Sequence, residues 1–141
     1  MTFNIIDCEK NDRAYIERKL VEYNLSQVPL TQEQAFHDVN KKIVDEDGNM
    51  IAGCIATIYC WKILYVELLW VDEAYRKCGL GTTLLNELEK AALEADCSLI
   101  HLDTFDFQAK DFYLKHGFEV FGVLEDCPEN HSRYYLKKKL K

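Results

Sequence analysis

The chain has 141 residues, of which 48% are hydrophobic and 29% are charged, and this length and composition are typical of one globular domain. Its formal net charge of −7 argues against nucleic acid as the main partner, because that partner usually requires a basic face. The sequence has no apolar run of about 18 residues to predict a membrane span, and no secretory signal pattern. None of the six cysteines forms a C-x-x-C pair, so we expect reduced thiols, no metal site and a cytoplasmic location.

The N-terminal third predicts a strand and a helix. Residues 2–7 (TFNIID) favour a strand. Asn11 or Asp12 is suited to cap a helix over 13–26, where apolar residues recur at helical spacing. This third of the chain contains no functional motif.

Antiparallel strands are predicted for the middle of the chain. Residues 39–61 predict a hairpin, because the turn signal DGN at 47–49 separates two apolar stretches. A further strand over 63–71 (ILYVELLWV) follows closely. Such a meander indicates antiparallel pairing.

Helices and strands alternate in the second half. Leucines and alanines at helical spacing predict a helix over 84–95. The remaining elements are a strand over 98–105, a helix over 107–116 that ends at Gly117, and strands over 118–125 and 132–140. The mixed order predicts one α+β domain over 1–141, a mixed α/β sandwich with a mostly antiparallel sheet and helices on both faces.

A glycine-rich turn at 75–83 (YRKCGLGTT) lies between a strand and a helix, a setting that suits a bound phosphate. A Walker-type loop is excluded because the sequence has no Gly-Lys pair. The dinucleotide pattern G-x-G-x-x-G fails at Leu84, which would obstruct close packing of helix on strand. A third pattern, [QR]-x-x-G-x-[GA], is matched at each fixed position by Arg76, Gly79 and Gly81.

With this motif the chain resembles the GNAT superfamily of acetyl-CoA-dependent N-acetyltransferases. Residues 68–76 (LLWVDEAYR) are similar to the family's fourth strand and the loop after it. Residues 107–120 (FQAKDFYLKHGFEV) are similar to a later family segment, A-x-x-x-Y followed by K-x-G-F, with Tyr113, Gly117 and Phe118 at fixed points. The resemblance covers roughly residues 64–121.

The resemblance implies acetyl-CoA as cosubstrate, with its pyrophosphate on the free amides at the helix start. Its pantetheine arm would pair with the strand over 63–71, which splays from the strand over 98–105 to give a V-shaped opening. The residues expected to bind the cofactor are Leu69, Trp70, Val71, Arg76, Lys77, Cys78, Gly79, Leu80, Gly81, Thr82, Gln108 and Tyr113.

Two positions depart from the family pattern. Lys77 stands where relatives commonly have glycine. Asp106, Phe107 and Gln108 occupy the region of an asparagine that holds the cofactor in relatives. Gln108 is the candidate to replace it, since its amide offers the same donor and acceptor.

The implied reaction is direct attack of a primary amine on the thioester. Tyr113 is the expected donor to the departing thiolate; the alternative is that it is one more core aromatic. A backbone N–H of Trp70 or Val71 would stabilise the oxyanion. Glu67 or Asp103 would accept the amine's proton through a water; the alternative for each is a solvated or hydrogen-bonded polar residue.

The sequence contains no clear signal for the identity of the acceptor, and the resemblance implies a small-molecule or peptide amine. We expect a monomer or homodimer with no nucleic-acid or membrane partner. A Cys78 nucleophile is the lesser hypothesis, because direct transfer is the family norm. The alternative to an enzyme is a non-catalytic acyl-CoA-binding or sensing module on the same fold.

Overall fold

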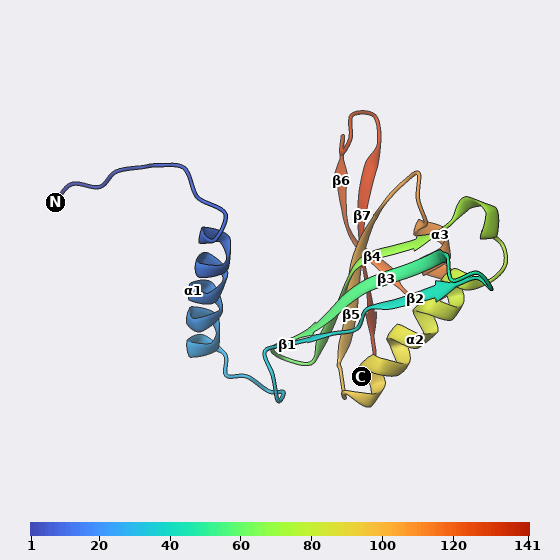
Figure 1. Cartoon of the computed structure of the whole chain (residues 1–141), viewed down its shortest axis with the longest axis horizontal. Helices are drawn as coiled ribbons and strands as arrows, with labels where there is room; N and C mark the ends of the chain where they lie inside the picture. Colours follow the sequence, from blue (N-terminus) through green and yellow to red (C-terminus); the bar gives the residue numbers. More distant parts are fainter.

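A seven-stranded sheet forms the centre of the computed structural model, which describes residues 1–141 (Figure 1). The strand order is β1-β3-β4-β5-β7-β6, with β2 also paired to β3, and only β4 and β5 run parallel. The strands are β1 (Phe36–Asp38), β2 (Lys41–Val44), β3 (Met50–Tyr59), β4 (Ile63–Val71), β5 (Leu99–Phe105), β6 (Glu119–Glu125) and β7 (Ser132–Lys139). The predicted mixed α/β fold with a mostly antiparallel sheet is confirmed.

Three helices and one short 3₁₀ turn connect or precede these strands. They are α1 (Asp12–Gln27), η1 (Glu73–Tyr75), α2 (Leu80–Glu94) and α3 (Lys110–Lys115). None of the helices has the length and apolar composition needed to cross a membrane. The helix after the glycine-rich turn begins at Leu80, earlier than the predicted residue 84, because Gly79 is its N-cap and Gly81 lies in its first turn.

The hairpin predicted for 39–61 forms as β2 and β3. Its turn is fixed by the Asp45 carboxylate, whose Oδ1 accepts hydrogen bonds from the amides of Asp47 and Asn49, both at 2.9 Å. Gly48 takes a φ of +83°, which a residue without a Cβ adopts at no steric cost.

The two parallel strands separate over half of their length. Only residues Ile63–Tyr65 of β4 pair with residues Leu99–His101 of β5. Beyond these residues the two strands are not paired with each other. β4 carries a bulge at the same place, because Ile55 pairs with Leu68 and Ala56 with Val66, so Glu67 has no partner. The expected splay between these strands is therefore present and begins at the bulge.

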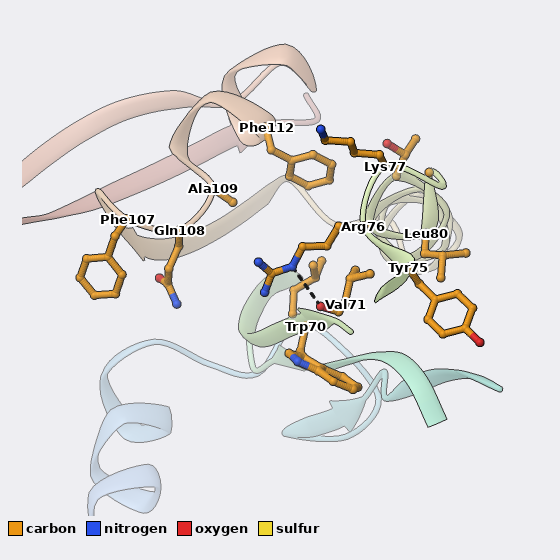
Figure 2. A pocket seen from close by; sticks show the side chains of 14 residues that line it. Trp70, Val71, Tyr75, Arg76, Lys77, Leu80, Phe107, Gln108, Ala109 and Phe112 are labelled. Carbon is orange, nitrogen blue, oxygen red and sulfur yellow. Dashed lines mark hydrogen bonds between the residues drawn. The ribbon is translucent and has the colours of Figure 1, made fainter. Parts of the chain in front are cut away.

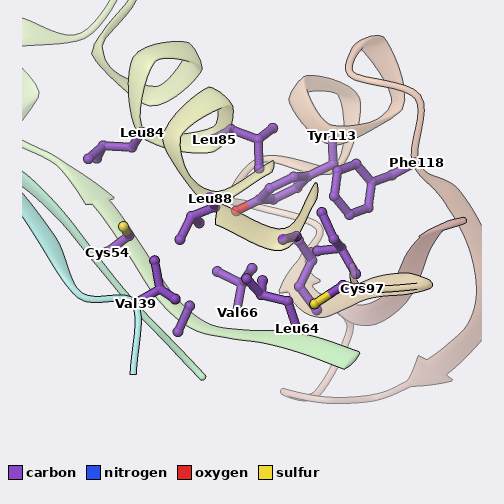
Figure 3. Packing of buried hydrophobic residues seen from close by; sticks show 14 of the residues in the cluster. Val39, Cys54, Leu64, Val66, Leu84, Leu85, Leu88, Cys97, Tyr113 and Phe118 are labelled. Carbon is purple, nitrogen blue, oxygen red and sulfur yellow. The ribbon is translucent and has the colours of Figure 1, made fainter. Parts of the chain in front are cut away.

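The core lies on one face of the sheet, beneath α2 (Figure 3). Side chains alternate along each strand, so every second residue of β3, β4 and β5 points to this inner face. The buried residues that meet there include Ala52, Cys54, Ala56, Ile58, Leu64, Val66, Leu84, Leu85, Leu88, Ala92, Ile100, Leu102, Tyr113, Phe118 and Leu136. The opposite side is called the outer face below.

The N-terminal part differs from the expectation. The strand predicted over 2–7 is wrong: residues 1–9 are exposed and pair with no strand, so the alternation has no sheet to join. The helix predicted over 13–26 forms as α1, but it stands away from the sheet and has no buried residue (Figure 1). The predicted helices on both faces of the sheet are therefore not found within this chain, because α2 and α3 share the inner face and no helix lies on the outer face.

Candidate active site

A cleft opens where β4 ends, η1 and the glycine-rich turn lead into α2, and the β5–α3 loop faces them (Figure 2). Its volume is about 510 Å³. Ten of the residues predicted to bind the cofactor line it: Leu69, Trp70, Val71, Arg76, Lys77, Gly79, Leu80, Gly81, Thr82 and Gln108. The structure thus brings together two chain segments that are more than twenty residues apart in sequence.

Free backbone amides point out of the start of α2. Gly79 precedes the helix with φ +79° and ψ 12°, the left-handed conformation that glycine adopts most easily. The first intrahelical bond runs from the amide of Thr83 to the carbonyl of Gly79 at 3.0 Å. The amides of Leu80, Gly81 and Thr82 precede that bond and have no acceptor in the helix. They form a ready site for an anion, which the helix dipole favours.

Two cations stand at this helix start. The Arg76 guanidinium extends into the cleft, and its Nε donates to the carbonyl of Val71 at 3.4 Å (Figure 2). Lys77 also lines the cleft, and its φ is +73°. This backbone conformation explains why the family that the chain resembles commonly has glycine at this position. A lysine in the same conformation strains the backbone.

The second glycine of the motif makes room for an aromatic ring. A Cβ built on Gly81 would lie 3.3 Å from Cζ of Phe112 and 3.8 Å from Cγ2 of Val71. Phe112 comes from α3 and reaches across the cleft to the start of α2 (Figure 2). The absence of a side chain at 81 therefore lets α3 close against the phosphate-binding turn.

Gln108 performs a structural task with one end of its amide. Its Oε1 accepts from the amide of Phe105 at 2.8 Å and from Oγ1 of Thr104 at 3.2 Å, which fixes the β5–α3 loop. The Nε2 group makes no hydrogen bond within the chain and lies at the cleft (Figure 2). Gln108 can therefore donate to a ligand without losing its role in the loop.

The backbone N–H and C=O groups of β4 point alternately toward β3 and toward the splay between β4 and β5. The amide of Asp72 donates to the carbonyl of Ile51 on β3 at 2.8 Å. Because backbone groups in an antiparallel pair alternate in direction, Trp70 also turns toward β3, whereas Leu69 and Val71 turn toward the splayed side. The sequence left Trp70 and Val71 open as backbone donors, and this geometry favours Val71.

Tyr113 lies in the core. The residue is only 6% exposed. The centroid of its ring lies 5.6 Å from that of Phe118, and its hydroxyl is directed toward Leu88 (Figure 3). Burial raises its pKa to about 12, with smaller contributions from Cys54 and Asp103. The neighbouring Phe112, about 100° around the same helix, lines the cleft instead.

The two candidate carboxylates have different surroundings. Asp103 is held by Arg133, whose Nη2 and Nε donate to its Oδ1 at 2.6 and 2.9 Å, and by the hydroxyl of Tyr65 at 3.4 Å. This bond to Asp103 raises the pKa of Arg133. Glu67 is exposed at the β4 bulge, where the splay begins, and has no ion-pair partner in the chain.

Some site residues differ from those chosen by sequence. Cys78 and Tyr113 are not among the residues that line the cleft. Four others line it that the sequence did not select: Tyr75, Phe107, Ala109 and Phe112. All four lie inside or beside the quoted motifs, so their proximity to a motif is the sequence feature from which they could have been predicted. No group of three or more His, Cys, Asp or Glu side chains that could hold a metal ion occurs in the structure.

Comparisons with known proteins agree with this geometry. The model of the acetyltransferase (GNAT) family matches residues 8–118. Blasticidin-S acetyltransferase of Streptomyces morookaense is 34% identical over 96 residues, which cover 67% of this chain and 70% of that protein. A crystal structure of an acetyltransferase from Bacillus cereus superposes with a TM-score of 0.88 at 38% identity, covering 98% of both chains. A streptothricin acetyltransferase from Bacillus anthracis, solved with acetyl coenzyme A, shares the fold with a TM-score of 0.64 at 21% identity, over 74% of this chain and 63% of that one.

Proposed function

Because the chain belongs to the acetyltransferase (GNAT) family, we propose that it transfers the acetyl group of acetyl-CoA to a primary amine by direct attack in a ternary complex. One observation carries the proposal. The free amides at the start of α2 and the unpaired backbone edge of β4 line a single cleft. This combination suits a ligand with a phosphate at one end and an extended, amide-bearing arm at the other.

The cofactor-binding residues divide by chemistry. The amides of residues 80–82, with Arg76 and Lys77, would hold the pyrophosphate, and the two side chains supply positive charge in a protein of net charge −7. The edge of β4 at Leu69 and Val71 would pair with the amides of the pantetheine arm. Nε2 of Gln108 would add a donor from the opposite wall.

Acetyl-CoA supplies the activated carbonyl: a bond forms between the amine nitrogen and the acetyl carbon while the carbon–sulfur bond breaks. The amide of Val71, turned toward the splay, would donate to the carbonyl oxygen as negative charge develops there. A donor fixed in a strand needs no reorganisation during the reaction, and such a group typically contributes about a hundredfold or more in rate.

Tyr113 is proposed to donate a hydrogen bond to the departing sulfur. Its pKa of about 12 keeps the phenol protonated at neutral pH, so the donor is always present. The same high pKa means that Tyr113 stabilises the thiolate by hydrogen bonding more readily than it surrenders its proton completely.

Glu67 is the better proposal for the group that takes up the amine's proton. It stands exposed at the bulge that opens the splay, with its carboxylate free to order a water. Asp103 was the other candidate, but its carboxylate is already held by Arg133 and by the hydroxyl of Tyr65. We assign Asp103 the role of holding β5 to β7.

The acceptor panel follows from the relatives. Since one relative bears the name of an acetyltransferase for blasticidin S, amine-bearing small molecules of that kind come first, followed by aminoglycosides, polyamines and peptides with a free N-terminus. Release of free thiol from acetyl-CoA is measured with each amine. Amine-dependent release, lost in Gly81→Val, is the expected result.

The rival function, a non-catalytic acyl-CoA-binding module, predicts a different pattern. Calorimetry would then show acetyl-CoA binding to the wild type, while no amine in the panel would release thiol. Absence of both binding and release would contradict the proposal and the rival together.

A further inference from the structure

The N-terminal arm, residues 1–27, carries apolar side chains that nothing in its own chain covers. Ile5 is fully exposed, and Leu20 is 58% exposed. On α1, Ile16, Leu20 and Tyr23 recur at i, i+4 and i+7, so they form one stripe along the helix. An apolar helix stripe of this kind normally faces a core, and contiguous apolar surface left open marks an interaction site.

The arm is nevertheless held in a defined direction. Trp61, in the β3–β4 turn, donates from Nε1 to the carbonyl of Val28 at 3.0 Å, just after α1 ends. The amide of Thr31 donates to the carbonyl of Cys60 at 3.0 Å, and the Gln32 side chain accepts from the amide of Lys62 at 2.8 Å. These bonds fix the exit of the arm at the β3–β4 turn and direct α1 away from the sheet (Figure 1).

The outer face of the same sheet also has apolar side chains that no helix of the chain covers. Met50, Ile55, Leu68 and Trp70 project from β3 and β4 on this face, with Leu68 59% and Trp70 46% exposed. They line a hollow of about 430 Å³. No helix of the chain covers them. The chain therefore has one uncovered helix stripe and one uncovered apolar hollow, and its exit bonds keep the two apart.

The arm belongs to the domain and is not an appended tail. The family match begins at residue 8, so it includes α1. The Bacillus cereus structure superposes over 98% of both chains with a TM-score of 0.88. Residues beyond 35 make up only about three quarters of this chain, so a superposition that left the arm unmatched could not reach that score. A solved relative therefore holds its arm in the same extended position.

We propose that two copies of the chain exchange these arms. The α1 stripe of each copy lies in the outer hollow of its partner, and the two contacts are related by a twofold axis. Exchange of an identical element is a low-cost route to a dimer, because each copy forms with its partner the contacts that a single domain would form with itself. The dimer gives each sheet a helix on its second face.

The exchange also bears on the active site, a step that rests on the proposed function. Trp70 lines both the outer hollow and the cleft. A partner helix packed against Leu68 and Trp70 therefore forms the outer boundary of the cleft beside the splayed strands. Acetyl-CoA binding uses the inner residues of a single copy, whereas acetyl transfer requires the partner's arm.

The test is the mass of the full chain by light scattering after size exclusion. The wild type is expected at twice the 16.5 kDa of one chain. Leu20→Glu places a charge in the α1 stripe, and Leu68→Glu places a charge in the outer hollow. Each variant alone is expected to be a monomer of 16.5 kDa. Arg18→Glu, on the opposite side of α1 from Leu20, is the matched control and stays dimeric.

Mixing the two monomeric variants tests the exchange itself. In a mixed pair, the intact arm of the Leu68→Glu chain meets the intact hollow of the Leu20→Glu chain, so a dimer reappears. The expected mixture has the mass of a dimer and regains part of the turnover. A monomeric wild type overturns the proposal, and so does a mixture that stays monomeric, because a dimer without exchange has no such complementation.

Calorimetry separates this proposal from the proposed function. Each monomeric variant is expected to bind acetyl-CoA as the wild type does and to show less than a tenth of its turnover. Full turnover in a monomeric variant overturns the partner's role in catalysis, while the acetyltransferase assignment stands.

Discussion

The cleft region and the N-terminal arm follow opposite rules of packing. From β3 to β7, the residues that form the cleft are supported by a core in which α2, α3 and the sheet of the same chain meet. The arm has no buried residue, although it contains as regular a helix as α2. A family motif can therefore be complete within one chain while a helix of the same chain stays uncovered, as α1 does here.

The largest expected effect concerns the self-contained core. Leu88→Ala removes a fully buried side chain where α2 meets the sheet, and it is expected to lower the free energy of unfolding by about 3 kcal/mol. Leu93→Ala is the matched control, because Leu93 is exposed on the same helix. Urea denaturation measures both. Equal effects would show that α2 is not packed as described.

The next effect concerns the free amides of the turn. Gly79→Val forces a β-branched residue to adopt φ +79° and is expected to weaken acetyl-CoA binding at least about a hundredfold, by reorienting the amides that follow. Gly48→Val is the control, since Gly48 has φ +83° and equally open space in a distant turn. Calorimetry should show normal affinity in the control. Equal losses would mean that backbone strain, and not the site, explains the result.

Tyr113→Phe is expected to reduce kcat about tenfold to a hundredfold while leaving acetyl-CoA affinity unchanged. Its pKa, raised by burial to about 12, also predicts an effect on stability. The folded state holds this proton more tightly than the unfolded one, so the wild type loses stability as the pH rises from 10 to 12. The phenylalanine variant should lose less over that window. Unchanged kcat would assign Tyr113 to the core alone.

The smallest effect tests the strain at Lys77. Lys77→Gly relieves its positive φ and is expected to raise the free energy of unfolding by up to about 1 kcal/mol, while loss of the charge weakens acetyl-CoA binding a few-fold. Lys77→Gln removes the charge without relieving the backbone. It should share the loss of affinity but not the gain in stability, and thermal unfolding separates the two.

Local signals predicted the cleft well and the arm poorly. The turn and β4 could be predicted because their residue types are required by local geometry: Gly79 by a positive φ, and the 63–71 run by burial. The position of α1 could not be predicted, since the periodicity of its apolar residues does not say what covers them. The ion pair of Asp103 with Arg133 joins residues 30 positions apart, and strand facing alone does not reveal it.

The facing of α3 was a further limit of the sequence. Phe112 and Tyr113 are adjacent, and the family pattern favoured Tyr113 as the residue at the cofactor. The structure gives the cleft wall to Phe112, because Gly81 leaves room for its ring, and gives the core position to Tyr113. The spacing fixed neither assignment, since both side chains are aromatic.

Backbone amide exchange with and without coenzyme A shows whether the cleft binds the cofactor at the start of α2 and along β4. Coenzyme A is expected to slow exchange at Leu80, Gly81 and Thr82, whose amides have no acceptor in the helix, and at Leu69 and Val71 on the splayed edge of β4. The amides of residues 1–27 should be unaffected. Protection confined to the outer hollow, or none at the start of α2, would contradict this mode of binding.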